Sequence, residues 1–188
     1  MLPNLSKLSV ADRLKLPTSI KVVVLCHGRP FAGHWQELVI RKRTQELFAD
    51  RIADGEVLDF FTLDPNPDRS NPADFPHGGA QDLFSSTKFS RTPRFHMIWA
   101  PDCGGEWQKM MEMKGDEQRK QLVDLALTMR QSLVPDGFMM LGKLPFEYSK
   151  LTEVADALRK AGFARAEVAP VPDPYGAETP LAYILLQK

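Results

Sequence analysis

The sequence predicts a single α/β domain built on a mostly parallel sheet. Its second half alternates between strand-like and helix-like segments, an order that favours strands joined by helical crossovers. In the first half, the run KVVVLC (21–26) is continuously apolar and rich in β-branched residues, which is typical of a strand buried on both faces. A chain of 188 residues is long enough to form one such domain with a sizeable core.

The expected elements follow in order along the chain. Residues 1–19 form an N-terminal arm with a helical turn begun by Ser9, and the domain spans 20–188. Strands are expected at 21–26, 56–64, 138–143, 164–170 and 181–188, and at the start of 95–105. Helices are expected at 36–53, within 120–137, and at 150–163. The proline-rich segment 65–94 shows no clean period and predicts a long loop, the kind of connection that often carries function.

Composition and charge exclude several classes of protein. Lysine plus arginine and aspartate plus glutamate number 24 each, so the chain as a whole is not drawn toward nucleic acid or membrane. No apolar run approaches the roughly 18 residues of a membrane span, and we expect no membrane partner. Two cysteines and the absence of a secretory signal predict a reducing, cytoplasmic location.

Polar and glycine residues follow two of the expected strands at the point where each strand ends. In open α/β sheets, ligands bind outside the carboxyl ends of the strands. That rule makes this edge of the sheet the expected site, and the residues it places there are Asp102, Cys103, Gly104, Gly105 and Lys143.

Three segments carry a resemblance to a known family. LVPDGFMMLGK, ALRKAGFARAEV and LAYILLQK are similar to the last helices and strands of class I S-adenosylmethionine-dependent methyltransferases, and the resemblance covers roughly residues 20–188. It implies a Rossmann-like domain whose last strand is antiparallel and tucked into the sheet. It also implies S-adenosylmethionine as the cofactor.

The resemblance also implies a cofactor pocket. FAGHW (31–35) is similar to the proline-glycine-glycine-tryptophan loop of the RNA ribose 2'-O-methyltransferases, with His34 in place of a glycine. Asp64, at the end of the second strand, matches the acid that binds the ribose hydroxyls, and Asp74 or Asp82 could meet the adenine amino group. The full set implied for the cofactor is Gly28, Gly33, His34, Trp35, Asp64, Asp74 and Asp102.

The same subgroup uses a Lys-Asp-Lys-Glu tetrad. Asp102 and Lys143 match its Asp and second Lys by position, and Glu178 matches its Glu. The first lysine has two candidates, Lys15 and Lys21. A lysine with a lowered pKa can deprotonate a ribose hydroxyl while a neighbouring carboxylate orients it.

The function expected from this resemblance is S-adenosylmethionine-dependent methyl transfer to an RNA ribose hydroxyl or to a small-molecule acceptor. The alternative is a catalytically inactive scaffold or binding subunit with a protein partner, because Arg29, Pro30 and Phe31 crowd the loop where glycines would stand. Asp64 and Asp102 could instead cap turns, and Lys143 could be a solvated strand-end charge.

Three other interpretations carry less weight. Cys26 and Cys103 lack the spacing of a zinc site, so no metal is expected. The run Arg41 to Arg43 is read as a solvated helix face rather than a phosphate contact. An α/β-hydrolase is set aside because the chain has no G-x-S-x-G run.

Overall fold

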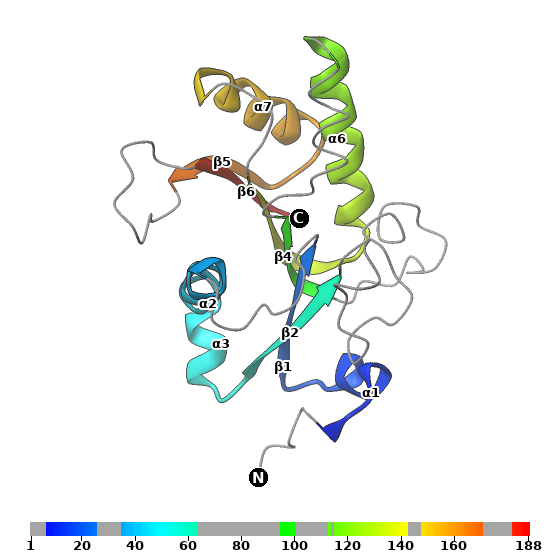
Figure 1. Ribbon diagram of the computed structural model, residues 1–188, viewed down its shortest axis with the longest axis vertical. Helices are drawn as coiled ribbons and strands as arrows, with labels where there is room; N and C mark the ends of the chain where they lie inside the picture. The colour runs from blue at the N-terminus through cyan, green and yellow to red at the C-terminus, as the bar shows by residue number, and fades with distance from the viewer. Residues whose placement is uncertain are drawn as a thin grey trace.

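The computed structural model describes residues 7–25, 35–63, 95–100, 113, 115–142, 148–170 and 182–188 (Figure 1). The helices are α1 (Val10–Lys15), α2 (Trp35–Leu47), α3 (Ala49–Ala53), α6 (Asp116–Arg130) and α7 (Tyr148–Lys160). The strands are β1 (Ser19–Leu25), β2 (Val57–Leu63), β3 (Phe95–Ala100), β4 (Leu133–Gly142), β5 (Arg165–Pro170) and β6 (Ala182–Gln187). Within this part of the chain, no helix is long and apolar enough to cross a membrane.

The six strands form one sheet in the order β2-β1-β3-β4-β6-β5. Strands β2, β1, β3 and β4 are mutually parallel, and β6 runs antiparallel to both of its neighbours, β4 and β5. The predicted α/β domain, with a mostly parallel sheet and an antiparallel last strand, is therefore confirmed. The apolar run read as a buried strand is β1, and all seven of its residues are buried.

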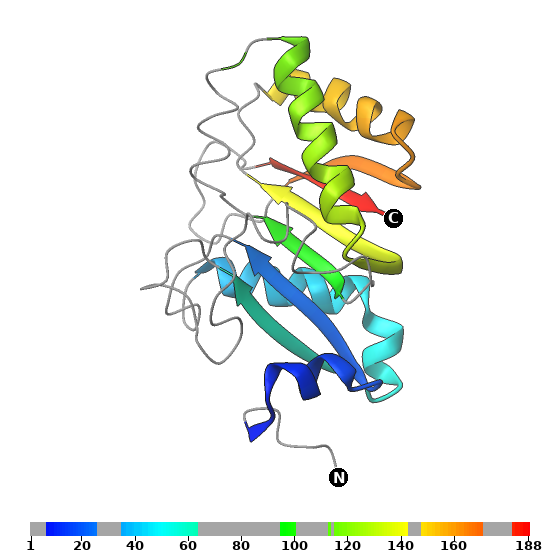
Figure 2. The same ribbon diagram turned by 90° about the vertical axis from the view of Figure 1, so that its right-hand side faces the viewer.

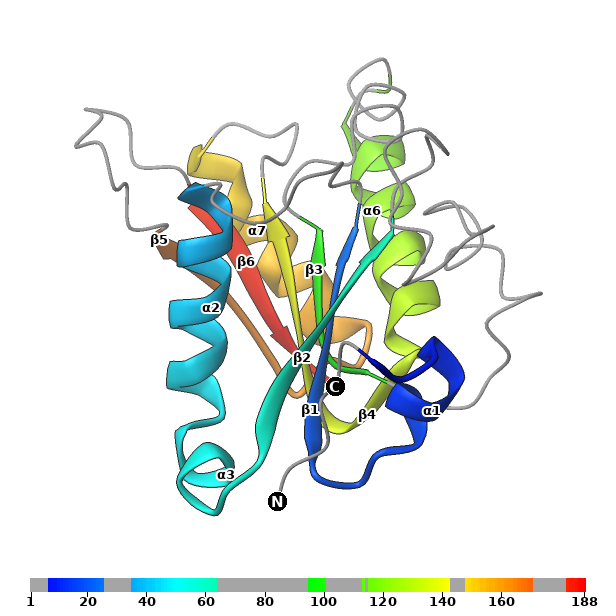
Figure 3. The same ribbon diagram turned by 60° about the horizontal axis from the view of Figure 1, so that its bottom comes forward.

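Helices cover both faces of this sheet, as Figures 2 and 3 show. Helices α6 and α7 pack on one face through an apolar cluster whose members include Leu122, Met129 and Leu158. Helix α2 packs on the other face through a second cluster, which includes Ile40 of α2 and Phe48, the residue that follows this helix. Burial on both sides explains why the central strands are apolar throughout rather than alternating.

Two expected boundaries were wrong. The helix expected over 36–53 is interrupted at Phe48, which leaves helical geometry (φ −118°, ψ 27°) and starts α3. Its ring is buried and packs edge-on against Phe138, so tertiary packing outweighs helix propensity at this point. Leu133, which lies in the segment 120–137 where a helix was expected, is instead the first residue of β4.

Strand β4 has an irregular start, and Gly137 makes it possible. The ladder with β3 shifts between the pairs Phe95–Leu133 and Met97–Phe138. A Cβ atom at Gly137 would lie 2.9 Å from the carbonyl oxygen of Val134 and 3.2 Å from that of His96. These contacts with backbone atoms leave room only for glycine, as is common at a bulge.

Helix α1 is tied to the edge strand β2 by a buried ion pair. Ser9 caps the helix as predicted, and its hydroxyl accepts a hydrogen bond from the Asp12 N–H at 3.2 Å. One turn later, the Arg13 guanidinium donates to both carboxylate oxygens of Asp59, with Nη2 at 2.5 Å from Oδ1. The same nitrogen donates to the Phe60 carbonyl at 2.8 Å, which fixes α1 against β2.

Candidate functional site

The carboxyl ends of the parallel strands meet at one edge of the sheet. The register pairs Leu25 with Leu63, the last residues of β1 and β2, and Ala100, the last residue of β3, with Leu141 of β4. On β4, Gly142 pairs with Tyr183, so antiparallel β6 begins where β4 ends. Four strand ends and one strand start therefore lie level with one another.

The chain reverses direction across the sheet at β1. From β1 the chain first goes to β2 on one side and then returns to β3 on the other side. In open α/β sheets the crevice outside the carboxyl ends at such a reversal is the usual ligand site, because the connections leave in opposite directions there. The candidate site is therefore the edge of the sheet above β1 and β3.

Most of the residues that the sequence proposed for the site follow these strand ends in the chain, and they lie outside the described residues. In the chain, Asp64 directly follows Leu63, Lys143 directly follows Gly142, and Asp102 stands two residues after Ala100. Others in segments outside the described ranges are Cys26, Gly28, Gly33, His34, Asp74, Asp82, Cys103, Gly104, Gly105 and Glu178. Trp35 is the first residue of α2, and its side chain is likewise not described.

Just below this edge, an aromatic pair packs in the core on the face of the sheet that α2 covers. The rings of Trp99 and Tyr183 are 5.8 Å apart, and both residues are buried. The Tyr183 hydroxyl accepts a hydrogen bond from Arg43 Nε at 2.7 Å, and burial raises the pKa of this tyrosine. Among the residues that the structure describes, none accepts a hydrogen bond from the buried Trp99 indole N–H. Trp99 is thus part of the core cluster beneath α2.

The basic run of α2 was read incorrectly as uniformly exposed. Lys42 is exposed, but Arg41 and Arg43 are half-buried. The Arg41 guanidinium lies 4.3 Å from the centre of the Phe60 ring, and Arg43 contacts Tyr183 as described above. Both aromatic partners belong to strands remote in the chain, so nothing in the local sequence signals these contacts.

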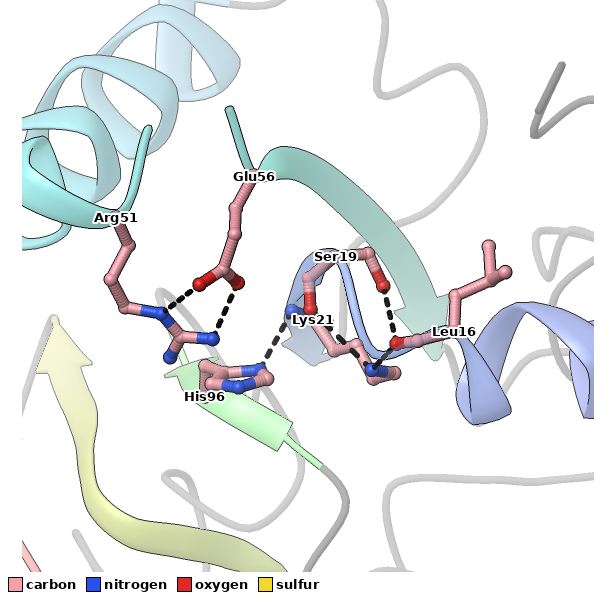
Figure 4. Close-up of polar contacts among 6 residues, drawn as sticks. All are labelled: Leu16, Ser19, Lys21, Arg51, Glu56 and His96. Atoms are coloured by element: carbon pink, nitrogen blue, oxygen red, sulfur yellow. Dashed lines mark hydrogen bonds and ion pairs between the residues drawn. The ribbon is translucent and has the colours of Figure 1, made fainter. Parts of the chain in front are cut away.

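A second polar cluster lies at the opposite, amino-terminal edge of the sheet (Figure 4). Lys21, in the first half of β1, donates from Nζ to the carbonyl oxygens of Leu16 at 2.6 Å and Ser19 at 3.4 Å. Nearby, Arg51 and Glu56 form a two-bond ion pair, with Nε to Oε1 at 2.8 Å and Nη2 to Oε2 at 2.5 Å. Burial lowers the pKa of Lys21.

Neither candidate for the first tetrad lysine lies at the carboxyl edge. Lys21 precedes the end of β1 by four residues, a separation of about 13 Å along a strand. Lys15 is exposed in the last turn of α1, which leads into the start of β1. The lowered pKa of Lys21 therefore reflects a structural role, since its ammonium is committed to backbone carbonyls.

His96 belongs to the same amino-terminal cluster and joins β3 to β1. Its Nδ1 accepts a hydrogen bond from the backbone N–H of Lys21 at 3.0 Å, so the neutral ring carries its proton on Nε2. Phe48 packs edge-on at 6.3 Å between ring centres. Burial, followed by the charges of Arg51 and Lys21, lowers the pKa of His96 to about 4. Within the part of the chain described, no group of three potential ligands could hold a metal ion.

We expect His96 to make folding stability depend on pH in mildly acidic solution. Its pKa is 6.5 in the unfolded chain and about 4 in the folded protein, so the unfolded state binds more protons between these values. The stability that neutral His96 contributes to the folded protein is therefore fully present above pH 6.5 and is lost as the pH falls toward 4. Allowing for solvent screening of the partly exposed ring, urea unfolding should show a loss of about 1–2 kcal/mol.

The matched variant is His96→Asn, whose amide oxygen can replace Nδ1 as the acceptor without titrating. It should flatten the pH dependence between pH 7 and 5, while His77→Asn should keep the wild-type slope. Equal slopes in the wild type and His96→Asn would show that this ring does not titrate with folding.

Comparison with known proteins finds this fold in a solved methyltransferase structure. No family model matches the sequence, and no curated protein matches it. The aminoglycoside resistance methyltransferase NpmB1 has a similar structure, with 12% identity, a TM-score of 0.51, and coverage of 95% of this chain and 91% of that chain. At that level of identity the likeness shows a shared fold, so the chain has the fold of a methyltransferase.

Two further solved structures resemble the chain at slightly lower scores. The 16S rRNA (adenine(1408)-N(1))-methyltransferase from Catenulisporales acidiphilia is 10% identical over 100% of this chain and 94% of that chain, with a TM-score of 0.48. A variant of that enzyme with cosubstrate SAM is 14% identical over 95% of this chain and 88% of that chain, with a TM-score of 0.49.

Proposed function

We propose that this protein transfers a methyl group from S-adenosylmethionine to RNA. The observation that carries the proposal is the strand order β2-β1-β3-β4-β6-β5, with antiparallel β6 inserted between β4 and β5. This order, together with the reversal at β1, is the arrangement that the resemblance to class I methyltransferases implies. It also provides the kind of sheet edge at which ligands bind in open α/β folds.

The residues that follow β1 and β2 suit an adenosine group. Asp64 supplies a carboxylate next to the end of β2, and a carboxylate can accept hydrogen bonds from both ribose hydroxyls. Gly28 and Gly33 permit close approach of the backbone after β1. Asp74, with Asp82 as the alternative, is proposed for the adenine amino group. His34, Trp35 and Asp102 complete the pocket.

The residues that follow β3 and β4 suit the methyl acceptor. When bound, S-adenosylmethionine supplies an electrophilic methyl group, so the protein's part is to position the acceptor in line and to remove its proton. Lys143, directly after β4, is proposed as the base for an RNA ribose hydroxyl. Asp102, after the neighbouring β3, would orient that amine, and Glu178, four residues before β6 in the chain, would stand beside it.

An RNA acceptor fits the similarity of FAGHW to the loop of the ribose methyltransferases and requires only local positive charge. The chain as a whole is neutral, so RNA binding would rest on a few placed cations rather than on a basic surface. A small-molecule acceptor is the alternative at the same site. The alternative that is not an enzyme is a catalytically inactive scaffold or binding subunit.

Calorimetric titration of the purified protein with S-adenosylhomocysteine tests the proposal. We expect micromolar binding that Asp64→Ala weakens at least about tenfold, because two charge-assisted hydrogen bonds are lost. Asp124→Ala, which removes an exposed carboxylate on α6, is the matched control and should bind like the wild type. If the wild type shows no binding at millimolar ligand, the proposed activity is wrong and the scaffold alternative gains support.

A further inference from the structure

Strand β5 forms one edge of the sheet, and among the described strands it pairs with β6 alone. The backbone of Gln187 in β6 faces β5, because its carbonyl oxygen accepts a hydrogen bond from the Ala164 N–H at 3.0 Å. The backbone of Lys188 faces the other neighbour, since its N–H donates to the Gly137 carbonyl of β4. Along an antiparallel ladder this direction alternates from one residue to the next, so the register shows which backbone groups of β5 point outward.

The outward-facing backbone groups of β5 include those of Ala166 and Val168. The register pairs Arg165 with Gln187, so the backbone of Arg165 points inward and that of its neighbour in the strand points outward. The strand ends at Pro170, which has no N–H to donate and occurs in sheets mainly at such edges. No described strand bonds the outward-facing groups, and this short edge can accept one more strand.

An exposed ion pair stands beside this edge. Arg165 and Glu167 are two residues apart and therefore lie on the same face of β5. Nη2 of Arg165 lies 2.5 Å from Oε1 of Glu167, and the two side chains are 46% and 43% exposed. An exposed pair of this kind adds little to the stability of its own chain. The order of its two signs, however, is one that a partner strand can complement.

We propose that β5 pairs with β5 of a second copy of this chain, antiparallel and about a two-fold axis at Ala166. In this register the two copies of Ala166 exchange both of their backbone hydrogen bonds. Arg165 of each copy then stands directly opposite Glu167 of the other, and facing charges of opposite sign stabilise an antiparallel pair. The proposal does not depend on methyl transfer, since β4 and β6 separate β5 from the candidate site at β1 and β3.

The same charges disfavour the neighbouring registers and unrelated partners. A two-fold axis at Arg165 or at Glu167 would set two like charges directly opposite each other, which is destabilising. An axis at Val168 would place Glu167 opposite Ala169 of the other copy and would lose the complementary charge. A strand of an unrelated protein would have to offer both signs at the same spacing. The pattern therefore favours a second copy of this chain in a single register.

Sedimentation velocity of the full-length protein over a range of concentrations tests the proposal. The wild type should form a dimer as the concentration rises. Glu167→Arg and Arg165→Glu should each weaken dimerisation at least about tenfold, because both facing pairs become pairs of like charges. An equimolar mixture of these two variants should dimerise again, since every facing pair then joins opposite charges. The double variant Arg165→Glu/Glu167→Arg should dimerise like the wild type for the same reason.

Arg159→Glu is the matched control, because it reverses an exposed arginine on α7 that also has an acid partner nearby. It should dimerise like the wild type. Hydrogen exchange locates the contact, since the Ala166 amide proton should exchange more slowly in the dimer than in the dilute monomer. A wild type that stays monomeric at millimolar concentration would overturn the proposal. So would a mixture of the two reversed variants that fails to associate, or a dimer in which the Ala166 amide gains no protection.

Discussion

Replacing Asp59 with alanine should destabilise the protein by about 3–5 kcal/mol, which is the effect expected when one partner of a buried ion pair is removed. Asp59 is 3% exposed and accepts three hydrogen bonds from the Arg13 guanidinium. The variant would take this carboxylate away from Arg13, whose guanidinium is buried over the Phe61 ring. It would also remove the negative charge that favours the protonated form of buried Lys21. Urea unfolding monitored by circular dichroism measures the change.

Two controls separate this loss from a general effect of removing an acid. Asp124→Ala removes an exposed carboxylate and should change stability by no more than about 0.5 kcal/mol. The double variant Arg13→Met/Asp59→Leu removes both charges and should recover much of the loss, because neither partner is then left unpaired. A loss below about 1 kcal/mol for Asp59→Ala would mean that the pair is not held in the buried geometry.

Replacing Lys143 with alanine should lower methyl transfer by about 10²–10⁴-fold if this lysine is the general base. The variant should keep its affinity for S-adenosylhomocysteine and its unfolding free energy, because Lys143 follows β4 rather than forming part of its buried ladder. Single-turnover methylation of capped and uncapped RNA gives the rate. In the wild type the rate should rise with pH as the amine loses its proton and then level off.

The matched control for this prediction is Lys160→Ala, which removes an exposed ammonium from the last turn of α7. It should leave the rate unchanged. If Lys143→Ala instead retains most of the wild-type rate, Lys143 is a solvated strand-end charge and the proposed tetrad fails. A pH-independent rate in the wild type would argue against a titrating base and would direct attention to acceptors that need no deprotonation.

The sequence predicted the fold because the signals for its elements are local. The run of β-branched residues in β1, the capping serine before α1 and the amphipathic faces of α6 and α7 each depend on neighbours a few residues apart. The antiparallel β6 followed from a resemblance carried by three segments, and the strand order confirms it. The edge that carries the candidate site also followed, since parallel strands joined by crossovers end on the same side.

The contacts that hold the protein together were beyond the sequence, because they join residues far apart in the chain. Arg13 meets Asp59, Lys21 meets His96, and Arg43 meets Tyr183, and none of these pairs has a spacing that a helix or a hairpin would reveal. The helix break at Phe48 has the same cause: its local sequence favours a continuous helix, and an aromatic contact with β4 overrides it.

The sequence by itself determined most of the segments that form strands and helices, and the edge of the sheet at which the parallel strands end, because periodicity and strand direction are properties of the chain. Only the tertiary structure decided which charges are buried and which have partners. It showed that Lys21, a candidate base, instead donates hydrogen bonds to backbone carbonyls. Burial and long-range pairing depend on how the elements pack, and a local stretch of sequence does not reveal them.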